Sequence, residues 1–200
     1  MGLAGVILAA GESTRMGRNK ALLPWPPGAK GHGTILSVAI TALGNHCDLV
    51  IVVAGKNEVE IQRVVFGCGA FLVRNAAPER GQFSSLQTGL REVLNRGRDN
   101  AMITLVDRPP AKAETLSSLV NAFAGRDHGV WAIVPEYHGK HGHPILIGRE
   151  MMEAFLQAPA SANAREIEHA SQQRIVYVAT EDPLVSVNVD TPEDYARFRL

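Results

Sequence analysis

A glycine-rich segment follows the first apolar run of the chain and reads Leu8-Ala9-Ala10-Gly11-Glu12-Ser13-Thr14-Arg15-Met16-Gly17-Arg18-Asn19-Lys20. The preceding run, Leu3–Ala9, is typical of a strand buried on both faces. Small residues let the backbone approach a ligand, and the N–H groups of such a turn can cradle phosphate oxygens. Three cations, Arg15, Arg18 and Lys20, face a single acid in this segment. We therefore interpret it as a local anion site.

The glycine spacing excludes two common phosphate-binding loops. A Walker A loop has four residues between its glycines and then Lys-Ser/Thr. Here five residues separate Gly11 from Gly17, and Arg18 comes next. A redox dinucleotide loop needs G-x-G-x-x-G, and Ser13 stands where its second glycine belongs. An ordinary solvated turn remains a weaker alternative.

Outward from this loop, short apolar runs alternate with amphipathic stretches. The alternation predicts an α/β fold, a three-layer α/β/α sandwich around a mostly parallel, Rossmann-like sheet of about seven strands. We expect one domain over residues 1–200, with a loop over 137–144 and a lid or sheet-edge extension formed by the last third. The predicted strands are Leu3–Ala9, Asp48–Val53, Ala70–Val73, Ala101–Val106, Val130–Pro135, Arg174–Val178 and Val185–Val189.

Composition excludes several classes of protein. Twenty Lys and Arg balance twenty Asp and Glu, which argues against a nucleic-acid coat or a polybasic membrane binder. No apolar run reaches the roughly 18 residues that a membrane span needs. Two cysteines, Cys47 and Cys68, make no disulfide scaffold, so we expect a reducing, cytoplasmic location.

The glycine-rich segment also carries a family resemblance. Its pattern L-A-A-G-x-S-x-R-M-G-x-x-K, followed by A-L-L-P, resembles the signature of the MobA-like nucleotidyltransferases. It is most similar to the molybdenum-cofactor cytidylyltransferase branch. The resemblance implies a nucleotide-diphospho-sugar transferase-like fold and a loop that wraps the base and triphosphate of a nucleotide. The nucleotide-binding residues implied here are Leu8, Ala9, Ala10, Gly11, Arg15 and Lys20.

Two further segments extend the resemblance to nucleotide and metal binding. Gly81-Gln-Phe-Ser84-Ser85-Leu resembles the family's G-x-x-S-S-L segment, which implies that Ser84 and Ser85 bind the nucleotide. A plain helix cap is the alternative. Asp107 ends a predicted buried strand and matches the Asp of the family's G-D-M-P, which binds Mg²⁺. In this chain Val106 and Arg108 replace the glycine and the methionine.

A third segment extends the resemblance toward the acceptor. Gly142-His143-Pro144 resembles the G-H-P that faces the acceptor in the cytidylyltransferase branch, and we assign His143 and Arg108 to acceptor binding. A zinc or nickel site at His138, His141 and His143 is a minor alternative that lacks a fourth ligand.

The last segment extends the resemblance toward the metal. The segment 187–194 resembles D-I-D-T-P-E-D, so Asp190 is expected to help Asp107 hold Mg²⁺. Equally, Asp190 could assist the helix start predicted at Thr191-Pro192.

Topology brings these segments together. Gly11, Asp107 and Asp190 each lie just beyond a predicted strand. In open α/β sheets, ligands bind beyond the carboxyl ends of the strands. If the strands are parallel, the loop and both acids meet in one crevice.

The resemblance implies a Mg²⁺-dependent nucleotidyltransferase, in which an acceptor phosphate attacks the α-phosphorus of a nucleoside triphosphate and pyrophosphate leaves. Lys20, Arg15 and Asp107 are the expected catalytic residues. CTP is favoured because the guanylyl branch tends to carry L-A-G-G where this chain has L-A-A-G. The implied acceptor is molybdopterin or molybdenum cofactor, with a molybdoenzyme as a partner. Two alternatives stay open: a sugar or alcohol phosphate as the acceptor, and a non-catalytic cofactor-delivery module.

Overall fold

Eight strands form one sheet in the computed structural model, which describes residues 2–28, 33–159 and 161–199. Their order is β3-β2-β1-β4-β7-β5-β6, and β8 pairs with the free side of β5. The strands are β1 (Leu3–Leu8), β2 (Leu49–Ala54), β3 (Phe71–Arg74), β4 (Asn100–Leu105), β5 (Ala132–Tyr137), β6 (Lys140–His141), β7 (Ile145–Gly148) and β8 (Ile175–Ala179). The helices are α1 (Ile35–Gly44), α2 (Glu58–Gly67), α3 (Gln82–Asn95), α4 (Ala113–Ala124), α5 (Arg149–Gln157), α6 (Ala164–Ala170) and α7 (Pro192–Ala196).

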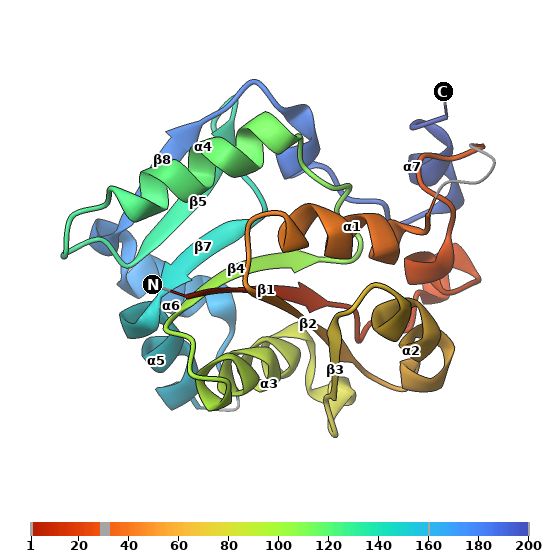
Figure 1. Ribbon diagram of the computed structural model, residues 1–200, viewed down its shortest axis with the longest axis horizontal. Coiled ribbons are helices and arrows are strands. Elements are labelled where there is room, and N and C mark those ends of the chain that lie inside the picture. Colours follow the sequence, from red (N-terminus) through yellow and green to blue (C-terminus); the bar gives the residue numbers. More distant parts are fainter. Residues whose placement is uncertain (1, 29–32, 160, 200) are drawn as a thin grey trace.

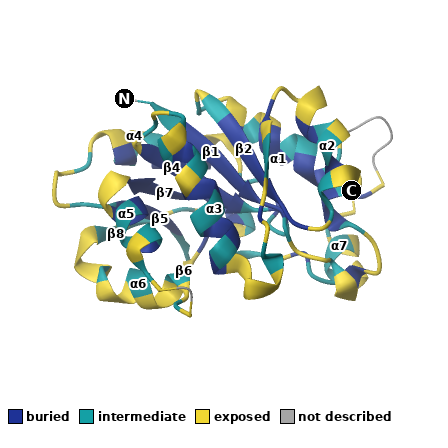
Figure 2. Cartoon of the chain, turned by 90° about the horizontal axis from the view of Figure 1, so that it is seen from below, coloured by how far each residue is buried: buried dark blue, intermediate teal, exposed yellow. Residues whose placement is uncertain are grey.

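Helices cover both faces of the sheet (Figure 1), because the side chains of each strand alternate between two buried cores. Ile7 and Val52 belong to the core beneath α1, α2 and α4. Their neighbours Val6 and Val53 belong to the core beneath α3 and α5. Figure 2 shows the central strands buried and the outer faces of the helices exposed. The prediction of a three-layer α/β/α sandwich is confirmed.

The centre of the sheet creates a natural crevice. β1 lies between β2 and β4 and is parallel to both. The chain therefore leaves β1 in one direction and later returns on its other side. Such a reversal of strand order opens a crevice at the carboxyl ends of the strands, where open α/β sheets bind ligands. The loops that follow β1 and β4 flank this point.

We predicted either a lid or a sheet-edge extension for the last third of the chain, and the structure shows the extension, because β7, β5 and β8 continue the sheet beyond β4. β7 inserts into the sheet between β4 and β5 and runs antiparallel to both. The segment predicted as a loop over 137–144 contains a hairpin that joins β5 to β6. His138 and Gly139 both have positive φ angles, 48° and 75°, as the tight turn of a two-residue hairpin requires. Six of the seven predicted strands form, and antiparallel β7 and the short β6 bring the total to eight.

The strand predicted over Val185–Val189 is wrong. Residues Pro183–Ser186 form a 3₁₀ turn instead. Pro183 has no N–H to donate to a ladder, and the Asp182 side chain accepts a hydrogen bond from the Leu184 N–H, which starts the turn. The neighbouring prediction Arg174–Val178 is confirmed as β8, parallel to β5.

Among the described residues, no helix has the length and apolar character needed to cross a membrane.

Candidate active site

A cavity of about 360 Å³ opens at the carboxyl ends of β1 and β4. Segments far apart in the sequence line it, which brings the glycine-rich loop together with both acids. The predicted site residues in its wall are Leu8, Ala10, Gly11, Arg15, Lys20, Ser85, Asp107 and Asp190. Ala9, Ser84, Arg108 and His143 are not among its lining residues.

Lys20 is the centre of the polar cluster in this cavity. The residue is 8 % exposed. Its Nζ donates hydrogen bonds to the Val189 carbonyl at 2.9 Å and to Asp190 Oδ1 at 3.1 Å. Asp107 Oδ2 lies 3.7 Å from the same Nζ, and Arg15 Nη2 lies 3.3 Å from Asp190 Oδ1. Two cationic side chains and two carboxylates therefore lie within ion-pair distance of one another in this cluster.

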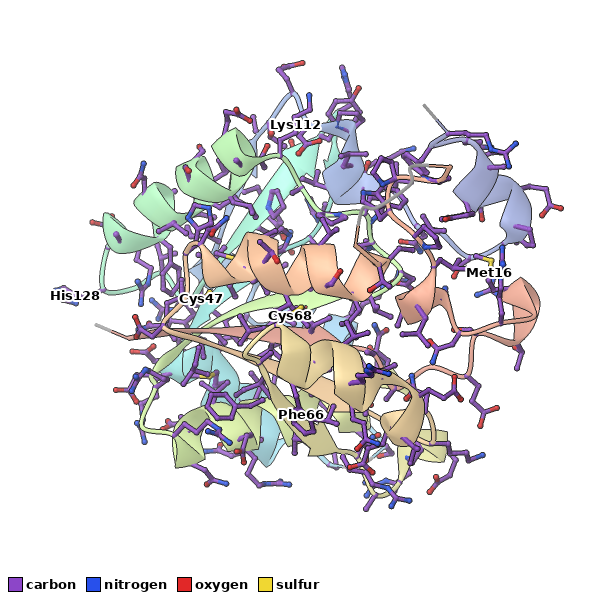
Figure 3. All side chains as sticks on the ribbon, turned by 45° about the vertical axis from the view of Figure 1, so that its right-hand side comes forward. Met16, Cys47, Phe66, Cys68, Lys112 and His128 are labelled. Atoms are coloured by element: carbon purple, nitrogen blue, oxygen red, sulfur yellow. The ribbon has the colours of Figure 1, made fainter. Side chains whose placement is uncertain are left out.

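The loop geometry explains why Lys20 points into the cavity. Ser13 adopts a left-handed backbone conformation, with φ of 53°, and its Oγ accepts a hydrogen bond from the Lys20 N–H at 3.2 Å. Met16 is buried and belongs to the core on the α1 side, so the loop is anchored at its middle (Figure 3). Both polar backbone groups of Ala9 are used within the fold, since its N–H bonds the Val53 carbonyl and its carbonyl accepts from Asn57 Nδ2.

Asp107 is held by its backbone rather than by its carboxylate. Its carbonyl accepts a hydrogen bond from the Val189 N–H at 2.7 Å, which ties the end of β4 to the segment that carries Asp190. Within the described part of the chain, Asp107 Oδ1 is buried and has no hydrogen-bond partner. A buried carboxylate oxygen without a donor is costly unless a cation occupies the position beside it. The donor set and this free oxygen both fit a hard divalent cation.

Ser84 and Ser85 are organised by a residue that the sequence analysis missed. Asn75 is 4 % exposed, and its Nδ2 donates to Ser84 Oγ at 2.8 Å and to Ser85 Oγ at 2.9 Å. Ser84 Oγ in turn donates to the Gly81 carbonyl at 2.7 Å, a bond within the first turn of α3 that is not a side-chain cap. Only Ser85 of the pair lines the cavity. Asn75 follows a predicted strand, the same signal that identified Asp107.

Arg108 and His143 lie next to the cavity and share one acceptor. Arg108 Nη1 and the His143 N–H both donate to the Val185 carbonyl, at 3.2 and 2.8 Å. Arg108 Nε and His143 Nδ1 are buried and have no partner among the described residues. Burial lowers the pKa of Arg108, although Asp107 and Asp190 oppose the shift. Burial and the Arg108 charge lower the pKa of His143 to about 3, so this imidazole is neutral at pH 7.

The other two histidines of this loop, His138 and His141, contact the rings of Tyr137 and Tyr177. His141 stacks on Tyr177 with ring centroids 3.9 Å apart, and its Nε2 lies 3.4 Å from Glu136 Oε2. Over residues 2–28, 33–159 and 161–199, no three His, Cys, Asp or Glu side chains gather in a metal-binding arrangement. The loop with His138, His141 and His143 therefore does not form the zinc or nickel site considered from the sequence.

Comparison with known proteins identifies the family. Residues 5–176 match the model of the MobA-like NTP transferase domain. The chain belongs to this family.

One transferase, one probable transferase and two solved structures are similar to this MobA-like NTP transferase. It is 28 % identical over 195 residues to the molybdenum cofactor cytidylyltransferase of Escherichia coli (strain K12), covering 95 % of this chain and 92 % of that protein. It is 35 % identical over 121 residues to the probable molybdenum cofactor guanylyltransferase of Mycobacterium avium (strain 104), covering 60 % and 57 %. The crystal structure of Rv0371c from Mycobacterium tuberculosis H37Rv shares the fold, with a TM-score of 0.80, 24 % identity and coverage of 99 % and 97 %. That protein has also been crystallised in complex with manganese, in a structure with a TM-score of 0.76, 23 % identity and coverage of 99 % and 98 %.

Several residues of this MobA-like transferase enter the cavity without a prediction. They come from the same loop, from the turn before α3 and from the end of β4: Glu12, Ser13, Thr14, Pro78, Gly81, Gln82, Leu105 and Val106. Six of the eight lie within two positions of a predicted site residue, so the motifs located the right segments. The motifs did not show which side chains of those segments turn inward.

Proposed function

We propose that this nucleotidyltransferase moves a nucleoside monophosphate, CMP from CTP, onto the phosphate of a molybdopterin-type acceptor and releases pyrophosphate, with residues 1–200 acting as one catalytic domain. The observation that carries the proposal is the contact of Lys20 and Arg15 with Asp107 and Asp190 inside the cavity under the glycine-rich loop. Phosphoryl chemistry needs positioning and charge stabilisation rather than covalent catalysis, and this arrangement offers both.

A divalent cation fits the two carboxylates. Asp107 and Asp190 would hold Mg²⁺ together with phosphate oxygens of the nucleotide, since Mg²⁺ takes oxygen ligands and few protein groups. The unpartnered Asp107 Oδ1 supports this assignment. The manganese complex of the Mycobacterium tuberculosis relative supports the use of a divalent metal. The metal would supply charge neutralisation at the reacting phosphates.

Different residues of the chain are assigned to different parts of the nucleotide. Lys20 is assigned to the α-phosphate and the incoming acceptor phosphate, because its ammonium lies beside both carboxylates. Arg15 is more exposed and is assigned to the β- and γ-phosphates, where charge accumulates as pyrophosphate leaves. Ser85 and the backbone of Leu8, Ala10 and Gly11 line the same cavity and are assigned to the rest of the nucleotide.

Arg108 and His143 are assigned to the acceptor. Each carries a buried nitrogen that has no partner among the described residues, and both donate a hydrogen bond to the Val185 carbonyl. A guanidinium offers a planar fork for a phosphate, whereas the methionine usual in the family offers none. The neutral His143 can accept or donate one hydrogen bond to a polar acceptor group.

The choice of base is tested by binding. Ala10 lines the cavity and belongs to the L-A-A-G pattern that favours CTP. GTP is the alternative, because the Mycobacterium avium relative is a probable guanylyltransferase. Titration calorimetry with CTP, GTP, ATP and UTP in Mg²⁺ is expected to show CTP binding most tightly. Tighter binding of GTP would replace the cytidylyl assignment with the guanylyl one.

The acceptor is tested by turnover. Pyrophosphate release from CTP that requires molybdopterin supports the proposal. Release with a sugar or alcohol phosphate alone would change the acceptor class. Nucleotide binding without any release, with every acceptor and with Mg²⁺ present, would favour the cofactor-delivery module.

A further inference from the structure

Arg15 and Lys20 share one anionic partner. Asp190 Oδ1 lies 3.3 Å from Arg15 Nη2 and 3.1 Å from Lys20 Nζ. A single carboxylate oxygen thus occupies, relative to both cations, the position that an anionic phosphate oxygen would take. Any phosphate that binds these two cations must displace this carboxylate or lie against its negative charge.

Because Lys20 is buried, its ammonium depends on the negative charge of Asp190. The Lys20 side chain is 10 % exposed, whereas the Arg15 side chain is 71 % exposed. A buried ammonium is strongly unfavourable unless an opposite charge stays close to it. Val189 contributes only a neutral carbonyl, and Asp107 Oδ2 is farther away, at 3.7 Å. Asp190 is therefore the main partner that neutralises Lys20.

We propose that Asp190 is a specificity-determining countercharge that rejects metal-free anions. Nucleotide, pyrophosphate or phosphate without a bound metal must compete with the Asp190 carboxylate for Arg15 and Lys20. A polyphosphate with a bound divalent cation offers Asp190 that cation as its ionic partner. Arg15 and Lys20 are then free to bind phosphate oxygens. The inference rests on the proposed nucleotidyltransferase function, and it adds that Asp190 couples nucleotide affinity to the metal.

A second acid of the same cavity provides a matched control. Glu12 also lines the cavity, but its carboxylate pairs with Lys56 Nζ at 2.6 Å and has no ion pair with Arg15 or Lys20 among the described residues. Glu12→Gln therefore removes one negative charge from the cavity without freeing either phosphate-binding cation. Any general effect of lost negative charge appears in this variant as well.

The experiment measures the binding of inorganic pyrophosphate to the full chain by titration calorimetry, first in EDTA and then in Mg²⁺. In EDTA, Asp190→Asn is expected to bind pyrophosphate about tenfold or more tightly than the wild type, because a unit charge at contact distance is removed. Asp190→Ala should change affinity in the same direction, since it also removes the carboxylate. Glu12→Gln should change affinity by less than about threefold. Mg²⁺ should improve binding by the wild type more than binding by either Asp190 variant.

The outcomes separate this inference from the proposed function. If the wild type binds pyrophosphate in Mg²⁺ and neither Asp190 variant binds it more tightly in EDTA, the countercharge role is wrong and the proposed function stands. An equal gain for Glu12→Gln would also overturn the countercharge role, because loss of any acid would then suffice. If the wild type binds neither pyrophosphate nor CTP in Mg²⁺, the proposed function fails and this inference fails with it.

Discussion

At the scale of single residues, the site depends on the placement of one ammonium group. Lys20 comes from a loop that has two other cations, yet only Arg15 and Lys20 of the three line the cavity. The motif identified the loop as an anion site from composition. Their contacts show that Arg15 and Lys20 face the carboxylates, whereas Arg18 does not line the cavity.

Lys20→Ala is expected to lower kcat/KM about 100- to 1000-fold, because loss of one critical electrostatic donor typically removes about 3–4 kcal/mol of transition-state stabilisation. Arg18→Ala removes a cation of the same loop outside the cavity and is expected to change kcat/KM only slightly. Steady-state pyrophosphate release measures both. Normal turnover by Lys20→Ala would disprove its assignment to the reacting phosphates.

His143 makes a prediction about pH. Its pKa falls from 6.5 to about 3 in the folded protein, through burial and the Arg108 charge. Below pH 6.5 the unfolded chain therefore binds a proton that the folded chain does not, so stability falls as the pH drops toward 3. The slope is at most about 1.4 kcal/mol per pH unit.

Urea unfolding at pH 7 and at pH 5 tests this effect. The wild type should lose more stability between these two values than His143→Gln, which has no titrating group at this position. An equal loss in both proteins would show that His143 titrates at an ordinary pKa in the folded state.

At the scale of elements, α3 packs on the sheet through a glycine. A Cβ atom added at Gly89 would lie 2.8 Å from Val6 Cγ1 and 3.0 Å from Val53 Cγ2. Both valines are fully buried and β-branched, so they have little freedom to move. The helix can therefore approach β1 and β2 this closely only without a side chain at that position.

Gly89→Ala is expected to lower the free energy of unfolding by about 1–3 kcal/mol, the usual effect of overpacking a core. Gly44→Ala is the control, because a Cβ atom there meets nothing within 4 Å and Gly44 ends α1. It should raise stability by about 0.5–1 kcal/mol through the lower entropy of the unfolded chain. Chemical denaturation measures both changes, and a Gly89→Ala protein as stable as Gly44→Ala would contradict the close packing.

At the scale of the whole molecule, Asp182 ties the C-terminal segment to α4. The residue is 2 % exposed. Its Oδ2 accepts hydrogen bonds from the Lys112 N–H at 2.7 Å and from Thr115 Oγ1 at 3.0 Å, and its Oδ1 accepts from the Leu184 N–H at 3.0 Å. These bonds join the chain just after Asp107 to the chain just before Asp190. The bonds of Asp182 thereby fix the segments that carry Asp107 and Asp190 relative to each other.

Asp182→Ala is expected to lower the free energy of unfolding by about 3 kcal/mol or more, because it leaves buried donors without an acceptor. Asp99→Ala provides the control, since Asp99 pairs with Arg149 on the surface and its loss should leave the unfolding midpoint nearly unchanged. Denaturant midpoints measure the difference. Equal midpoints for the two variants would show that Asp182 does not hold the segments together.

The local patterns of the chain predicted the elements that local physics controls. Valine- and isoleucine-rich runs predicted β1, β2, β4 and β5, because strands buried on both faces need continuous apolar sequence. β8, which has no fully buried residue, was predicted from its alternating pattern. The pattern Thr191-Pro192 predicted α7, and the Thr191 side chain does cap it by accepting from the Asp194 N–H. β7 was missed because three apolar residues before a glycine are too few to distinguish a strand from a loop, and its antiparallel entry between β4 and β5 depends on long-range pairing.

By itself, the sequence determined that this protein is a layered α/β fold with a glycine-rich, cation-bearing loop after its first strand, and it predicted that the loop, Asp107 and Asp190 share one site. Only the tertiary structure decided that Asp190 reaches the cavity without a strand before it, and that it contacts Lys20 from a position 170 residues away. The reason is physical. Hydrophobic period and capping act over a few residues, whereas the pairing of a buried charge is settled by whichever segments the packed sheet brings together.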